Sequence, residues 1–138
     1  MTDFFCYTER MSVQDSTKKT IVVIEDDPFY STIFEKKLTL EGYNIIHAPD
    51  GEQGLKAIRE KKPDLILLDM IMPVKDGMET LKDLRADPAL KDSKVIVLSN
   101  LGQESDIQMT KEYNALDYIV KSNMSIQEMV EKVRKYLS

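Results

Sequence analysis

Cysteine and histidine each occur only once in this chain of 138 residues. The single cysteine, Cys6, can form no disulfide within the chain, so a reducing compartment suits the protein. The single histidine, His47, excludes every metal site or mechanism that needs two histidines. His47 stands near the end of an apolar run, where a structural histidine with a satisfied hydrogen bond is expected.

The chain also lacks an excess of basic residues and any long apolar run. Its 24 acidic residues outnumber its 19 lysines and arginines, which gives a formal net charge of −5. Such a chain offers no basic surface to replace the counterions of nucleic acid or of an anionic membrane. No apolar run approaches the roughly 20 residues of a membrane span, and the first residues lack the pattern of a signal peptide. We therefore expect a cytoplasmic protein that binds neither nucleic acid nor membrane.

The length of the chain corresponds to one domain. Residues 1–19 show no hydrophobic period and are rich in Thr, Ser, Asp and Lys, so we expect a flexible N-terminal extension there. A regular alternation of apolar and polar segments begins at residue 20 and continues to the end of the sequence. We therefore expect one folded domain over residues 20–138.

Short apolar runs, typical of buried strands, alternate with segments that carry helical spacing or helix-boundary signals. The expected strands cover residues 21–24, 43–48, 65–69, 95–99 and 117–120. Asp27 and Pro28 favour a helix start after the first strand, and Ser125 with Glu128 forms a capping-box pattern before the last helix. Continuous apolar strands that alternate with helices predict a doubly wound α/β fold: a five-stranded parallel sheet with helices on both faces.

Polar side chains stand at the carboxyl ends of four predicted strands. Glu25 and Asp26 follow the first strand, and Asp69 ends the third. Ser99 ends the fourth strand, and Lys121 follows the fifth. In open parallel sheets these ends gather at one edge, where functional groups are found. Carboxylates, a hydroxyl and an ammonium group are therefore expected to converge.

This combination suits the handling of a phosphoryl group. Clustered carboxylates repel one another, and Mg²⁺ relieves that repulsion with one or two carboxylates, a carbonyl and water as ligands. The cation also offsets the charge of an arriving phosphoryl group. A carboxylate such as Asp69 can attack phosphorus and form an acyl phosphate. Ser99 and Lys121 can then hold the phosphoryl oxygens.

The order and spacing of these motifs resemble a response-regulator receiver domain. The motifs are IVVIEDDP at 21–28, LILLDMIMP at 65–73, Asp76-Gly77, Ser99 and YIVK at 118–121. The resemblance covers about residues 20–138. It implies a flavodoxin-like, CheY-like arrangement with strand order 2-1-3-4-5.

The resemblance also implies a role for each site residue. Asp69 corresponds to the phosphoacceptor, and the metal site would comprise Glu25, Asp26, Asp69 and the backbone carbonyl of Ile71, with Mg²⁺ as the cofactor. Asp26 would be the more direct ligand, and Glu25 would act through water. Lys121 corresponds to the lysine that contacts the phosphoryl group. Ser99 corresponds to the switch hydroxyl, and Tyr118 to the aromatic switch.

The implied function is that of a phosphoacceptor in a two-component phosphorelay. The chain would take a phosphoryl group from a histidine kinase or phosphotransfer protein and signal to a protein partner by a conformational switch. The output face would comprise the fourth helix, the fifth strand and the fifth helix, from about Leu101 onward. No DNA-binding or catalytic segment follows the last predicted helix, so we expect output by protein contact. We also expect a monomer or a weak phosphorylation-dependent dimer, and no catalysis beyond its own phosphorylation and dephosphorylation.

Several residues depart from the family pattern, and two of them keep an alternative open. Ser122 follows the lysine where the family usually has proline, often with a cis bond. A cis bond without proline costs about 2.5–4 kcal/mol, so a trans bond is expected here, which could place the lysine differently. Asn100 follows Ser99 where a small residue is usual. The alternative is a degenerate receiver that acts as a phosphorylation-independent interaction module. A phosphatase with an aspartyl-phosphate intermediate would want an acid where Ile71 stands.

Overall fold

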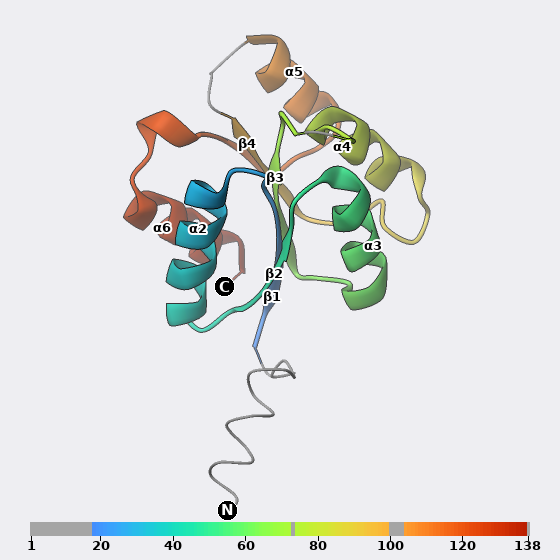
Figure 1. Cartoon of the computed structure of the whole chain (residues 1–138). Coiled ribbons are helices and arrows are strands. Elements are labelled where there is room, and N and C mark those ends of the chain that lie inside the picture. The colour runs from blue at the N-terminus through green and yellow to red at the C-terminus, as the bar shows by residue number, and fades with distance from the viewer. Residues whose placement is uncertain (1–17, 73, 100–103, 138) are drawn as a thin grey trace, which may run out of the picture.

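A computed structural model describes residues 18–72, 74–99 and 104–137 (Figure 1). The extension predicted for residues 1–19 lies outside this part except for its last two residues, and it stays a prediction. No helix within the described residues has the length and apolar character that a membrane crossing requires.

Five parallel strands form one sheet in the order β2-β1-β3-β4-β5. The strands are β1 (Thr20–Ile24), β2 (Asn44–Ala48), β3 (Leu65–Asp69), β4 (Val95–Ser99) and β5 (Asp117–Val120). The predicted fold class and strand order are confirmed. Every residue of β3 and β4 is buried, because both faces of these strands are covered, and such strands appear in a sequence as unbroken apolar runs.

Helices cover both faces of the sheet (Figure 1). One face carries α2 (Pro28–Leu40) and α6 (Ile126–Leu137), and the other carries α3 (Gly51–Lys61) and α4 (Gly77–Ala86). The helix α5 (Glu104–Glu112) joins β4 to β5, and a short 3₁₀ turn, η1 (Lys121–Asn123), follows β5. Alternate residues of β1 point into two separate apolar cores, Ile21 and Val23 into one and Val22 and Ile24 into the other. The sheet is therefore rigidly packed, and its edge can hold side chains in place.

The capping signals in the sequence form the hydrogen bonds that they predict. The Asp27 carboxylate accepts from the backbone N–H of Phe29 at 2.9 Å, and Pro28 is the first residue of α2. The N–H of Glu128 donates to the Ser125 hydroxyl at 3.1 Å, and the Ser125 N–H donates to the Glu128 carboxylate at 3.1 Å. Because Asp27 comes only three residues after the end of β1, α2 begins at the carboxyl edge of the sheet.

The segment between β3 and α4 folds back against the end of β3. The Gly77 N–H donates to the Met70 carbonyl at 3.0 Å, and the Gly51 N–H donates to the Lys75 carbonyl at 3.2 Å. A Cβ atom at Gly77 would lie only 2.3 Å from the Asp69 carbonyl oxygen, so glycine permits this close approach. These contacts hold the backbone that follows Asp69.

Candidate functional site

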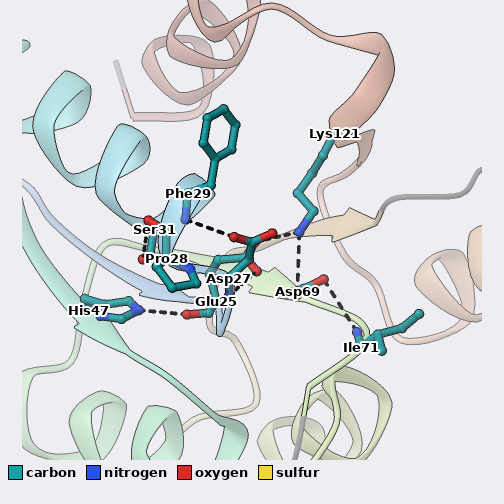
Figure 2. Close-up of polar contacts among 9 residues, drawn as sticks. All are labelled: Glu25, Asp27, Pro28, Phe29, Ser31, His47, Asp69, Ile71 and Lys121. Carbon is teal, nitrogen blue, oxygen red and sulfur yellow. Dashed lines mark hydrogen bonds and ion pairs between the residues drawn. The ribbon is translucent and has the colours of Figure 1, made fainter.

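Three charged side chains from separate strands meet at the carboxyl edge of the sheet (Figure 2). The Lys121 Nζ lies 2.7 Å from Glu25 Oε1 and 3.6 Å from Asp69 Oδ2. Glu25 has no exposed surface, and Asp69 and Lys121 are exposed by only 4% and 6%. β1 and β3 are neighbours, whereas β5 lies two strands from β3. The long side chain of Lys121 spans the distance from the end of β5 to the two carboxylates. The strand-end rule predicted this convergence correctly.

Asp26 completes an acidic cluster beside this group. One carboxylate oxygen from each of Glu25, Asp26 and Asp69 lies within 4.8 Å of the others, and Asp26 is exposed. Both Glu25 oxygens have partners, because Oε1 accepts from Lys121 and Oε2 accepts from the Asp27 N–H at 3.2 Å. The cluster therefore offers only oxygen donors, the kind that hard divalent cations prefer.

The other predicted site residues lie around this centre. Ser99 is buried at the end of β4, and Tyr118 is half-buried in β5 and packs against the core beneath α3 and α4. The Ile71 N–H donates to the Asp69 carboxylate over a long 3.5 Å, and the Ile71 side chain is 69% exposed (Figure 2). The switch roles of Ser99 and Tyr118 stay predictions, and Asn100 lies outside the described residues.

Comparison with known proteins decides the family. The model of the response regulator receiver domain matches residues 21–134. This chain is a receiver domain of the response-regulator family. The transcriptional regulatory protein CpxR of Klebsiella pneumoniae is 37% identical over 117 residues, which make up 85% of this chain and 48% of CpxR. The chain spans about half the length of the curated relatives it matches.

Solved receiver structures share the fold at moderate identity. The phosphorylated cyanobacterial phytochrome response regulator RcpA is 29% identical, with a TM-score of 0.77 and coverage of 88% of this chain and 95% of RcpA. The Mn²⁺-bound form of response regulator Rcp1 is 28% identical, with a TM-score of 0.72 and coverage of 85% and 90%. This chain is therefore similar both to a phosphorylated receiver and to a metal-bound one.

The serine after Lys121 does not remove the lysine from the site of this receiver. No peptide bond in the described ranges is cis, as expected for Lys121-Ser122. Lys121 begins the η1 turn, and its ammonium still lies within 3.6 Å of Asp69. The departure at Ser122 therefore leaves the carboxylate–ammonium arrangement in place.

Two residues at the site were not predicted to be there. The Tyr30 ring lies with its centroid 4.4 Å from the Lys121 Nζ. His47 Nε2 lies 2.7 Å from the Glu25 carbonyl oxygen, and because a carbonyl only accepts, this nitrogen carries the hydrogen (Figure 2). His47 thus has the structural hydrogen bond that was expected, but its partner was not foreseen. Tyr30 stands four residues before Phe34, a helical spacing that indicates a face toward the sheet.

Burial raises the pKa of the Asp69 carboxyl from 3.8 to about 7. The hydrogen bond and the negative charge of Glu25 act in the same direction, because both favour a protonated neighbour. The Lys121 charge and the Ile71 N–H lower this pKa, but not enough to cancel the rise. The surroundings of Asp69 therefore favour its protonated form at pH values where a free aspartate is ionised.

Between pH 5 and pH 8 without metal, the Asp69→Asn variant is expected to gain about 2–3 kcal/mol of stability relative to the wild type. The folded pKa lies above the unfolded one, so the folded wild type binds the extra proton, and its stability falls as pH rises from about 4 through 7. The amide cannot ionise and lacks this contribution. Urea unfolding with a chelator at pH 5 and pH 8 measures the difference, which should widen toward pH 8. A difference that stays constant with pH would contradict this explanation.

Proposed function

We propose that this receiver domain accepts a phosphoryl group on Asp69 from a histidine kinase or phosphotransfer protein. The observation that carries the proposal is the burial of the Asp69 carboxylate beside an ammonium group and two further carboxylates. Burying several charged groups together costs free energy. Phosphoryl chemistry is one of few roles that explain why the fold keeps such a cluster at the carboxyl edge of its sheet.

In the proposed transfer, a carboxylate oxygen of Asp69 attacks the phosphorus of a phosphohistidine. The new P–O bond forms as the P–N bond breaks, and the imidazole leaves with the electron pair and takes up a proton. Lys121 already lies beside Asp69 and is placed to pair with the added phosphoryl oxygens. Ser99, on the neighbouring strand, is proposed to turn its hydroxyl toward the same group.

The oxygen donors of Glu25, Asp26 and Asp69 fit a magnesium ion. Asp26 is exposed and would bind it directly, whereas Glu25 would act through water because both of its oxygens already accept hydrogen bonds. The carbonyl of Ile71 is the proposed backbone ligand. When bound, the ion would offset the charge of the incoming phosphoryl group. The Mn²⁺-bound Rcp1 structure supports a divalent cation in a related receiver.

The output is proposed to be contact with a protein target through the face formed by α5, β5 and α6. Tyr118 lies half-buried on β5 within this face, and it is proposed to act as the aromatic switch. The relatives named transcriptional regulators, such as CpxR, are about twice as long as this chain.

Intact mass after incubation with acetyl phosphate and Mg²⁺ tests the proposal. The wild type should gain about 80 Da, the mass of one phosphoryl group, and Asp69→Asn should gain nothing. Asp92→Asn makes the same chemical change at an exposed position and should behave as the wild type. A gain by Asp69→Asn would overturn the assignment. No gain by the wild type, even from a phosphohistidine protein, would favour the degenerate interaction module.

A further inference from the structure

We propose that Tyr30 is a positioning residue that holds the Lys121 ammonium group where it can meet a phosphoryl group. The inference rests on the proposed phosphorylation of Asp69 and adds a residue of α2 to that site. Tyr30 would not touch the phosphoryl group. Its ring would act through the lysine.

The ammonium group of Lys121 lies near two carboxylates and one aromatic ring. Nζ lies 2.7 Å from the Glu25 carboxylate, 3.6 Å from the Asp69 carboxylate and 4.4 Å from the centroid of the Tyr30 ring. The lysine side chain is only 2% exposed. A cation within about 6 Å of an aromatic centroid is attracted to the ring face, and the attraction grows when water is excluded.

The ring is itself held in place. Tyr30 stacks edge-on against Phe29, with centroids 5.2 Å apart, and lies tilted against Phe34 at 5.9 Å. It also packs against the core that α2 and α6 share. Because the Asp27 cap starts α2 at the carboxyl edge of the sheet, the first turn of this helix brings Tyr30 next to the acidic pair.

The Tyr30 ring meets Lys121 in a confined space. Tyr30 and Lys121 line the same narrow crevice, together with apolar side chains of α2, β5 and α6. The space in this crevice is about 20 Å³, which is little more than one water molecule occupies. The crevice therefore has room for about one water molecule, and bulk water is kept away from the contact between the ring and the ammonium group.

The neighbourhood of Lys121 explains why such a support matters in this chain. The lysine is followed by Ser122 in a short 3₁₀ turn, so no proline ring restrains the backbone at the next residue. The lysine side chain has a flexible stem of four carbons, so the position of its ammonium group depends on the contacts that this group makes. Glu25 and Tyr30 supply contacts that exist before any phosphoryl group arrives.

Phosphorylation rates of five variants test the inference. With acetyl phosphate and Mg²⁺, Tyr30→Leu should lower the labelling rate of Asp69 roughly threefold to thirtyfold, the range expected for a buried cation–π contact. Tyr30→Phe keeps the ring and should retain most of the rate. Tyr136→Leu removes another tyrosine that packs on the same core and should leave the rate unchanged. In a Lys121→Ala background, Tyr30→Leu should cause no further loss.

The same loss in both backgrounds would overturn the inference, because the ring would then act without Lys121. A rate in Tyr30→Phe as low as in Tyr30→Leu would also overturn it, because the hydroxyl and not the ring face would then be responsible. A second readout needs no phosphorylation. In the metal-free protein, the Lys121 Hε resonances should be shifted upfield by the ring in the wild type and in Tyr30→Phe, and should return toward ordinary values in Tyr30→Leu. Unshifted wild-type resonances would refute the contact. A shifted lysine in a chain that never gains phosphate would instead refute the proposed function.

Discussion

Replacing Lys121 by methionine is expected to lower the free energy of unfolding of the metal-free receiver by about 3–5 kcal/mol near neutral pH. The ammonium group is buried and contacts both Glu25 and Asp69, which are themselves buried. Methionine fills a similar volume but leaves two carboxyl groups facing each other without a cation. Urea unfolding in the presence of a chelator measures the loss.

The loss should depend on pH in a defined direction. The Lys121 charge lowers the pKa of Asp69, so its removal raises that pKa further above the unfolded value. The variant should therefore be closest to the wild type near pH 5, where Asp69 is protonated, and fall behind as pH rises through 7. Lys132→Met is the matched control. Lys132 pairs with Asp117 at 2.6 Å but is one-third exposed, so its loss should cost about 1 kcal/mol or less. Equal losses in the two variants would contradict this account.

The fold was predictable because the strands are short and largely apolar and because helix-boundary signals follow several of them. Burial on both faces produces the runs at 65–68 and 95–98, and the Asp27 and Ser125 caps form the hydrogen bonds that their positions suggest. The site was predictable for a related reason. Parallel strands bring their carboxyl ends to one edge, so Glu25, Asp69 and Lys121 had to lie near one another.

The contacts of Lys121 could not be predicted in the same way. Tyr30 has the helical spacing of an ordinary core residue, and its approach to the lysine depends on how α2 lies on the sheet. The effect of Ser122 could not be predicted either, because a trans Lys121-Ser122 bond does not determine where the ammonium group of Lys121 lies. Both depend on tertiary packing, which a single sequence does not encode as a local pattern.

Gly77→Ala is expected to lower the free energy of unfolding by about 3 kcal/mol, because the added methyl group cannot be accommodated. An ideal Cβ at Gly77 would lie 2.3 Å from the Asp69 carbonyl oxygen and 2.6 Å from the Met70 Cα. Both are backbone atoms of the segment that leaves β3, so relief requires that segment to move. The same movement would displace the Asp69 side chain, and labelling by acetyl phosphate should slow at least about tenfold.

Gly42→Ala separates this steric effect from the general cost of losing a glycine. Gly42 has φ +100°, and nothing lies within 4 Å of its ideal Cβ, so alanine there is strained without a clash. That strain should cost about 1–2 kcal/mol in unfolding free energy. Gly42 lies between α2 and β2, at the amino ends of the strands, whereas Asp69 lies at the carboxyl ends. Labelling of Asp69 in Gly42→Ala should therefore continue at the wild-type rate. Labelling that slows equally in both variants would mean that lost stability, and not the displacement of Asp69, limits phosphorylation. Slow labelling in Gly77→Ala alone would show that the close approach of α4 to the end of β3 holds the phosphoacceptor in position.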